Sequence, residues 1–192
     1  MNRTAPAAAC LGDLGAGSAI LAGSAELSQA DQLQHLPRPE YLLRDILQPI
    51  KGNFDYVFID TPAALGILTI NALTAADSVI ITVCPEEWSA DGIDLLTAAI
   101  DAVQRRTNPG LDVAGILITQ NFPNTIFCRD MRDNLGDIAR ALNTRVFDTA
   151  ISHSVKVKEA NFFGANLFDY APKSRPAEEY AAFTEELLKT QI

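Results

Sequence analysis

Residues 54–60 read FDYVFID, residues 78–83 read SVIITV and residues 113–119 read VAGILIT. Each is a short apolar run, rich in β-branched or aromatic residues, of the kind that predicts a buried strand. Helical patterns alternate with these runs, at about residues 65–75, 89–106, 124–142 and 176–189. Because such alternation is typical of parallel strands covered by helices, the sequence predicts an α/β fold with a doubly wound, mostly parallel sheet and helices on both faces.

Weaker patterns complete the expected organisation. A short strand is expected at Ser18–Leu21, a further one at residues 145–147, and a helix that Pro39 opens and that runs to Gln48. We expect a lead-in rich in small residues over 1–30 and one α/β domain over 31–192, since a chain of 192 residues suits a single domain.

Composition excludes several classes of protein. Hydrophobic residues make up 48% and charged residues 20%, which is globular composition, and no apolar run is long enough for a spanning helix. The start lacks the apolar stretch of a secretory signal, and the scattered Cys10, Cys84 and Cys128 form no zinc-type pair, which favours a reducing cytoplasm. The acidic C-terminal helix argues against a membrane anchor. With a net charge of −9, DNA contact would need a local basic patch.

Polar side chains follow the predicted strands, where ligands bind in open α/β sheets. The strand ends carry Asp60-Thr61-Pro62, Cys84-Pro85-Glu86 and Thr119-Gln120-Asn121. An aspartate at the tip of an apolar strand is the Walker-B arrangement, in which the carboxylate holds magnesium opposite a nucleotide phosphate. The alternative, that Asp60 caps the following helix, stays open on spacing alone.

Longer blocks of the chain resemble a known family. FDYVFIDTPAALGILTINALTAADSVIITV, EEWSADGIDLL, RRTNPGLDVAGILIT and VFDTAISHSVKVKEANFFGANLFDYAPKSRPAEEYAAF follow one another in the order and spacing of the ParA/Soj chromosome- and plasmid-partition ATPases. These proteins, with MinD, form the deviant-Walker group of P-loop NTPases. The resemblance implies a P-loop NTPase-like fold that binds ATP and magnesium. Asp60 would be the metal ligand, and the cofactor-binding candidates are Asp60, Thr61, Pro62, Gln120, Asn121 and Pro172. For the segment around Pro172, the alternative is plain capping of the last helix by Ser174.

The phosphate-binding part of that family has no match in this sequence. The resemblance implies an amino-terminal strand followed by KGGVGKTT, yet no lysine precedes Lys51. The stretch Gly12–Ser18 has the G-x-x-x-x-G spacing, but it lacks the lysine and carries Asp13 where phosphates would sit, so a flexible lead-in is favoured. We therefore expect a fold truncated at the amino-terminal strand, weak or absent binding of ATP and magnesium, and no hydrolysis. Whether this reflects truncation or natural loss stays open.

The family binds DNA non-specifically, and its matching blocks give the DNA-binding candidates Arg129, Arg132, Lys156 and Lys158. Arg105 and Arg106 form a further basic pair. Acidic neighbours of the first two arginines, and His153 where relatives often have arginine, weaken the patch. Any contact would be weak, directed at phosphates and sensitive to salt.

Two functions remain from these observations. One is a ParA-like partition protein that lacks its phosphate loop; the other is a non-catalytic interaction module that pairs with or regulates a ParA- or ParB-type partner. The expected partners are a second copy or a homologous chain and a ParB-like adaptor, with no membrane, and the resemblance allows association with the nucleoid. A sheet without its first strand exposes backbone edges, so we also expect dimerisation or aggregation. A receiver-type domain built on Asp60 is excluded, because neither its acidic pair nor its late lysine is found.

Overall fold

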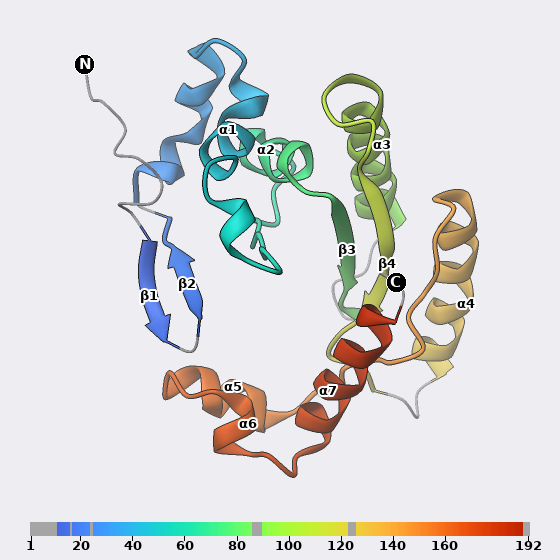
Figure 1. The fold of residues 1–192 in the computed structure, drawn as a ribbon. Helices are drawn as coiled ribbons and strands as arrows, with labels where there is room; N and C mark the ends of the chain where they lie inside the picture. Colours follow the sequence, from blue (N-terminus) through green and yellow to red (C-terminus); the bar gives the residue numbers. More distant parts are fainter. Residues whose placement is uncertain (1–10, 16, 24, 86–89, 123–125, 190–192) are drawn as a thin grey trace. The chain divides into compact units, whose positions relative to one another are not determined.

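The computed structural model describes residues 11–15, 17–23, 25–85, 90–122 and 126–189. Contacts within the chain divide it into two compact units (Figure 1). The first unit comprises Met1–Asp77 and Asp94–Leu111, and the second comprises Ser78–Ile93 and Asp112–Ile192. The domain boundary expected after residue 30 does not coincide with a unit boundary and stays a prediction. Among the described residues, no helix is long and apolar enough to cross a membrane.

A parallel strand pair forms the centre of the second unit. Strand β3 (Ser78–Val83) pairs with strand β4 (Asp112–Ile118) from one end to the other. The segment 145–152 continues the sheet on the other side of β4, through isolated parallel bridges from Ile116 to Val146 and from Asn121 to Ser152. The two predicted strands are confirmed, and the weaker one expected at 145–147 is reduced to a bridge.

The apolar core of the second unit lies between this sheet and the last helix, α7 (Arg175–Leu188). Phe147, which is fully buried, meets Phe183 of α7 edge to face, with 4.9 Å between ring centroids. Space beside Phe147 is so tight that a Cβ atom at Gly115 would lie 2.6 Å from its ring, so only glycine fits there. The close contact between the backbone of β4 at Gly115 and the ring of Phe147 thus fixes how the strand and the ring pack together.

Two glutamates of α7 fasten the same segment by its backbone. The Glu186 carboxylate accepts the N–H groups of Asp148 and Thr149, at 2.8 and 3.0 Å. Glu179 accepts both the backbone N–H and the hydroxyl of Ser152, at 2.6 and 2.7 Å. Burial acts to raise the pKa of Glu186, but the two backbone donors and nearby Arg145 outweigh it and lower that pKa overall.

The remaining helices of the second unit are α4 (Ile126–Ala141), α5 (Val155–Phe162) and α6 (Leu167–Tyr170). Helix α4, which the sequence predicted, buries Met131, Leu135 and Ala139, spaced one helical turn apart. Helices α5 and α6 were not predicted; Ser154 caps α5 by accepting the N–H of Lys156, and Asn166 caps α6 in the same way. Helix α3 (Ala90–Arg106) begins in the second unit and continues in the first.

The first unit starts with a hairpin and continues in short helices. Strands β1 (Leu11–Gly15) and β2 (Ser18–Leu21) pair antiparallel. The helical elements that follow are η2 (Ala25–His35), η3 (Pro39–Tyr41), α1 (Leu42–Leu47), η4 (Lys51–Asn53) and α2 (Ile67–Ala75). The helix expected from Pro39 is confirmed as a 3-10 turn that leads into α1, and the helix expected at 65–75 is α2.

One buried side chain joins these helices. Asn71 of α2, 4% exposed, accepts the backbone N–H of Leu43 at 3.0 Å. Its amide nitrogen donates to the carbonyls of Pro39 at 2.8 Å and Ile67 at 2.9 Å. All the main polar groups of this buried amide are therefore satisfied within the unit.

The strand expected at residues 54–60 is wrong for this structure. No strand is assigned there, and Tyr56, Val57 and Phe58 are 55%, 47% and 82% exposed. An apolar run becomes a buried strand only if a neighbouring strand takes up its backbone groups and other side chains cover it. The described residues provide neither to this segment.

Candidate functional site

The Walker-B candidate lies in the first unit, in the segment that leads into α2. Asp60, Thr61 and Pro62 are all exposed and lie outside any strand or helix. Just beyond them the chain turns: the Thr69 hydroxyl donates to the carbonyl of Ala64 at 2.7 Å. Asp60 does not cap α2, whose N-cap residue is Gly66. The alternative that Asp60 caps the following helix is therefore wrong.

The second group of candidates lies at the carboxyl end of β4, in the second unit. Asn121 donates its backbone N–H to Ile151 at 2.9 Å and accepts that of His153 at 3.1 Å. Gln120, just before it, is exposed with φ of +51°, a conformation that residues other than glycine seldom adopt outside special sites. The ring of His153 stacks on Phe122, with 5.0 Å between centroids. This strand end is thus firmly built, as expected for the binding edge of an open α/β sheet.

The last cofactor candidate, Pro172, is exposed in the loop between α6 and α7, also in the second unit. Ser174 is the N-cap residue of α7 by position, but its hydroxyl accepts no capping hydrogen bond. The prediction that Ser174 stands at the start of the last helix is therefore confirmed, but the hydrogen bond by which its hydroxyl would cap that helix is not formed. Asp60 to Pro62 belong to one unit, and Gln120, Asn121 and Pro172 to the other.

The glycine-rich stretch Gly12–Ser18 forms most of the β1–β2 hairpin. Gly15 and Gly17 have φ of +79° and +77°, and the Asp13 carboxylate accepts the backbone N–H of Gly15 at 2.8 Å. A phosphate loop instead joins a strand to a helix, and its N–H groups point at the anion. In this hairpin an aspartate side chain already takes one of those N–H groups.

The DNA-binding candidates differ in their exposure and in whether another group of the protein engages their side chains. Arg132 is half-buried and donates to the carbonyls of Phe147 at 2.7 Å and Asp148 at 3.3 Å. Lys158 is exposed on α5, and the side chain of Arg129 lies outside the described part, as do Cys10, Glu86 and Trp88. Arg105, from the further basic pair, pairs with Asp101 at 2.9 Å.

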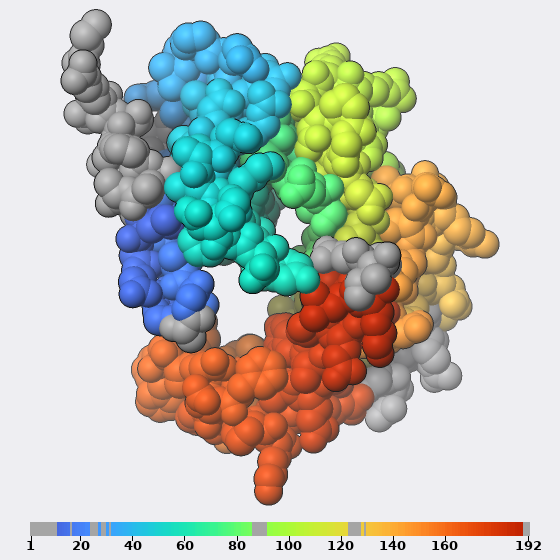
Figure 2. Space-filling model, viewed as in Figure 1, coloured from blue at the N-terminus to red at the C-terminus, as the bar shows by residue number. Residues whose placement is uncertain are grey.

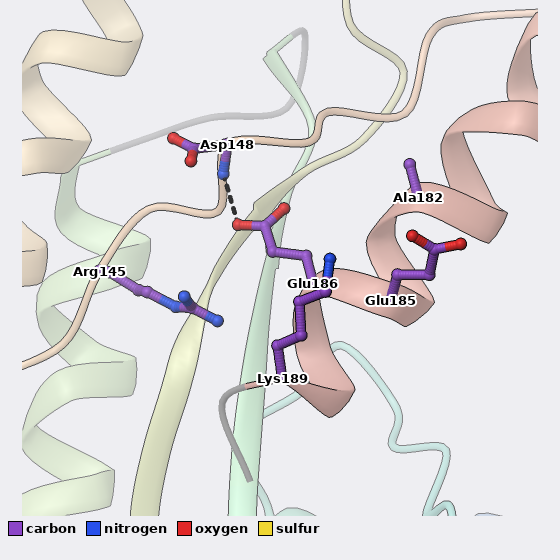
Figure 3. A pocket seen from close by; sticks show the side chains of 6 residues that line it. All are labelled: Arg145, Asp148, Ala182, Glu185, Glu186 and Lys189. Atoms are coloured by element: carbon purple, nitrogen blue, oxygen red, sulfur yellow. Dashed lines mark hydrogen bonds between the residues drawn. The ribbon is translucent and has the colours of Figure 1, made fainter. Parts of the chain in front are cut away.

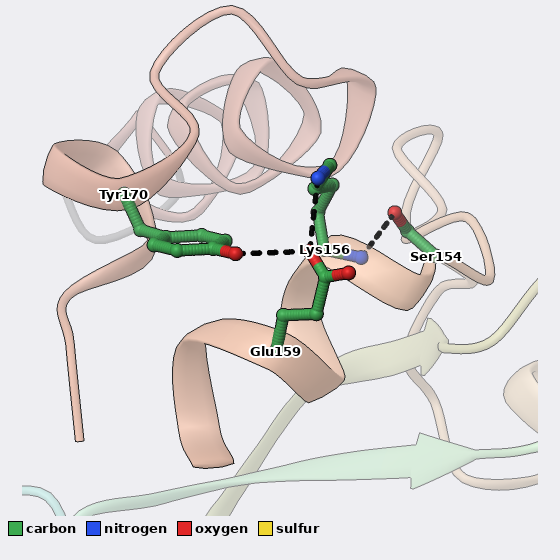
Figure 4. A network of polar contacts seen from close by, with 4 residues as sticks. All are labelled: Ser154, Lys156, Glu159 and Tyr170. Carbon is green, nitrogen blue, oxygen red and sulfur yellow. Dashed lines mark hydrogen bonds and ion pairs between the residues drawn. The ribbon is translucent and has the colours of Figure 1, made fainter. Parts of the chain in front are cut away.

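Lys156, the fourth candidate, takes part in a polar network (Figure 4). Its ammonium group lies 2.9 Å from the Glu159 carboxylate, which also accepts the Tyr170 hydroxyl at 3.0 Å. The hydrogen bonds with Lys156 and Tyr170 lower the pKa of Glu159, and that carboxylate raises the pKa of both partners. The Lys156 ammonium is therefore engaged by a carboxylate, whereas the partners of Arg132 are neutral carbonyl groups.

A shallow cavity of about 340 Å³ lies beside α7 (Figure 3). Its lining residues are Arg145, Asp148, Ala182, Glu185, Glu186 and Lys189. The Glu186 carboxylate within it is engaged by the backbone of Asp148. None of the predicted site residues lines this cavity, and its mixed charges favour no one class of ligand.

No pattern in the sequence predicted the contacts that hold the segment beside the carboxyl end of β4. Glu179 and Ser152 are 27 residues apart and became neighbours only through folding. The pairing of Lys156 with Glu159 could have been found, since residues three apart on a helix face each other.

Comparisons with known proteins identify relatives. A family model described as AAA domain matches residues 13–113. The chain is 34% identical over 176 residues to the chromosome partitioning protein ParA of Myxococcus xanthus, covering 88% of this chain and 59% of that protein. It is 36% identical over 153 residues to the sporulation initiation inhibitor protein Soj of Bacillus subtilis, covering 77% and 57%. The chain thus spans little more than half the length of these curated relatives.

Solved structures agree on the fold. A crystal structure of cobyrinic acid a,c-diamide synthase from Mycobacterium smegmatis matches with a TM-score of 0.78 and 30% identity, over 96% of this chain and 68% of that one. A second structure of that protein holds ADP and magnesium. The predicted P-loop NTPase-like α/β class is therefore confirmed. From the matched family model and these identities, the chain belongs to the ParA/Soj family of partition proteins.

Proposed function

We propose that this chain acts in the cytoplasm as part of a ParA-type partition system, in a form that does not hydrolyse ATP by itself. The observation that carries the proposal is the β1–β2 hairpin at Gly12–Ser18, where the glycine spacing of a phosphate loop and a serine come together without the lysine. Without a phosphate cradle and its lysine, most of the positioning and charge stabilisation of phosphoryl transfer is lost.

Binding of ATP and magnesium would be weak for the same reason. The M. smegmatis relative holds ADP and magnesium, which supports a nucleotide as the ligand of the family. Asp60, the metal candidate, is exposed, and this sequence contains no lysine-bearing phosphate loop that could accompany it. A single carboxylate holds magnesium well only together with phosphate oxygens and ordered water.

Binding of a fluorescent ATP analogue to the purified chain, with and without magnesium, tests this proposal. We expect no magnesium-dependent binding, and no change on Asp60→Asn. Asp55→Asn is the matched control, since it removes another exposed carboxylate from the same segment. Tight magnesium-dependent binding that Asp60→Asn abolishes and Asp55→Asn keeps would overturn the proposal.

DNA affinity would be weak and non-specific. Arg132 and Lys156 each have a side-chain donor engaged by another group of the protein, which leaves Lys158 as the most available of the described candidates. Fluorescence anisotropy with a labelled duplex at rising salt measures the number of phosphate contacts. We expect a shallow salt dependence, and Lys158→Ala to reduce it further.

A second function is favoured by the exposed segment 54–60. Such an exposed apolar run favours a non-catalytic module that associates with another chain: a second copy, a complete ParA-type homologue or a ParB-like adaptor. Sedimentation of the chain alone and with a complete ParA relative tests it. A strictly monomeric chain that leaves the relative's sedimentation and ATPase rate unchanged would rule it out.

A further inference from the structure

Helices α5 and α6 carry a cluster of exposed apolar side chains. Val155, Phe162, Phe163 and Phe168 are 60%, 84%, 65% and 47% exposed, and we call them the α5–α6 patch. The two helices that carry it are orange in Figure 2. Single exposed apolar residues are ordinary, but three phenylalanines within seven residues are not. The Gly12–Ser18 hairpin and the 54–60 segment lie in the other unit, so this patch is a separate feature.

Two phenylalanine rings of the patch are in contact with each other. Phe162 and Phe163 meet edge to face at 5.3 Å, and Phe163 lies 6.0 Å from the ring of Tyr170. Tyr170 is in turn anchored by its hydrogen bond to Glu159. Side chains that already pack on one another have less rotamer freedom to lose when a partner binds. Rigid aromatic side chains are also the groups that most often dominate binding energies.

The charge around the patch indicates the chemistry of that partner. Lys158 lies three residues after Val155 and four before Phe162, so the three side chains share one face of α5. Glu159, the acidic residue on this helix, is already engaged by Lys156. From Val155 to Lys173 there are three lysines against Glu159 and Asp169, a net charge of +1 in a chain of −9. The stretch of chain that carries the patch is thus slightly basic in an acidic protein, and Lys158 is the lysine that shares a helix face with Val155 and Phe162.

We propose that the α5–α6 patch is a docking surface for an acidic segment of another protein that carries bulky apolar side chains. The apolar anchors of the segment would pack on Phe162 and Phe163, and a carboxylate would pair with Lys158. The overall negative charge of the chain would repel acidic peptides in general, so that only one with matching anchors would stay bound. This inference is independent of nucleotide binding.

Fluorescence anisotropy on the full chain tests the proposal. The probe is a short labelled peptide in which glutamates alternate with leucines around one tryptophan, and its control has lysines in place of the glutamates. We expect the acidic peptide alone to bind, and Phe162→Ser to weaken it about tenfold. Lys158→Glu should weaken it about threefold or more, with an effect that shrinks at high salt.

Matched variants control for general effects. Leu95→Ser removes a 63% exposed leucine from α3, and Lys51→Glu makes the same charge change at an exposed lysine of the first unit. Both should bind the acidic peptide like the unaltered chain. The proposal is overturned by equal binding of the two peptides, by no binding of either, or by an unchanged Kd in Phe162→Ser. It is also overturned if sedimentation shows that Phe162→Ser dissolves a homodimer, because the occupant would then be a second copy.

Discussion

Two apolar runs of similar length meet different fates in this protein. In Ser78–Val83 the side chains of Ile81 and Val83 are buried and each residue pairs with β4. In Phe54–Asp60 the side chain of Phe58 is 82% exposed, and no strand forms. The difference lies less in the runs themselves than in their surroundings, since β3 has β4 beside it.

The comparison shows that an apolar run forms a strand only where a second strand pairs with it. Backbone N–H and C=O groups of an extended segment must find partners, and a hydrophobic pattern cannot provide them. A run that has the pattern without the partner is a surface ready for association. Packing around β4 should therefore dominate stability, whereas residues 54–60 should affect association.

The largest expected effect is that of Phe147→Ala, which breaks the packed side of the comparison. Phe147 is fully buried, and its removal should lower the free energy of unfolding by about 3–5 kcal/mol. The counterpart Phe58→Ala should change it by less than about 0.5 kcal/mol. Urea denaturation followed by circular dichroism measures both. Equal losses in the two variants would contradict the contrast between the regions.

Gly115→Ala should come next, because its new methyl group would lie 2.6 Å from the Phe147 ring. We expect overpacking to cost about 1–3 kcal/mol of unfolding free energy. Phe147→Leu in the same chain should recover part of that loss, so the two changes should not be additive. If the double variant loses the full sum of the two single losses, the close contact is not what makes glycine necessary.

Glu186→Gln should sharpen the role of the 145–152 segment, which borders β4. At pH 7 the loss of a charged acceptor for two backbone N–H groups should cost about 1 kcal/mol. Because folding lowers the pKa of Glu186 below 4.5, its contribution is complete above that pH and is lost as the pH falls through the folded-state value.

The difference in unfolding free energy between Glu186→Gln and the unaltered chain should therefore shrink as the pH is lowered. Urea midpoints measured across a pH series test this. The exposed neighbour Glu185 provides the control Glu185→Gln, for which no such difference is expected. A difference that stays constant down to acid pH would mean that the carboxylate charge is not what fastens the segment.

The smallest effect on stability is expected for Phe58→Lys, which tests the exposed side of the comparison. Its unfolding free energy should stay within about 0.5 kcal/mol of the unaltered chain. Light scattering at high protein concentration should fall, since a charge within the exposed apolar segment opposes association with another chain. Leu95→Lys adds the same charge elsewhere and should leave scattering higher than Phe58→Lys does.

Local patterns predicted the elements that local physics decides. The bounds of β3 match those expected, and α2, α4 and α7 lie within two residues of theirs. The hairpin strand β1 was missed because glycines give no strand pattern, and α5 because its residues alternate without one clear apolar face.

The candidate site was predicted only in part, for a related reason. Strand ends could be located from the apolar runs, which placed Gln120 and Asn121 at a well-built edge. The use of Arg132 as a donor to two carbonyls could not be foreseen, because it depends on a segment 15 residues away. A count of basic residues therefore overestimates the number of side-chain donors available to DNA.

Asn71 gives the first unit a fixed alignment. Its three hydrogen bonds reach Pro39, Leu43 and its own helix at once. A slip of α2 by one turn would break the two hydrogen bonds that leave the helix, to Pro39 and Leu43, and would leave buried polar groups unpaired, at a cost that apolar contacts alone would not impose. One amide thus sets the alignment of helices whose leucines and isoleucines alone would tolerate several alignments.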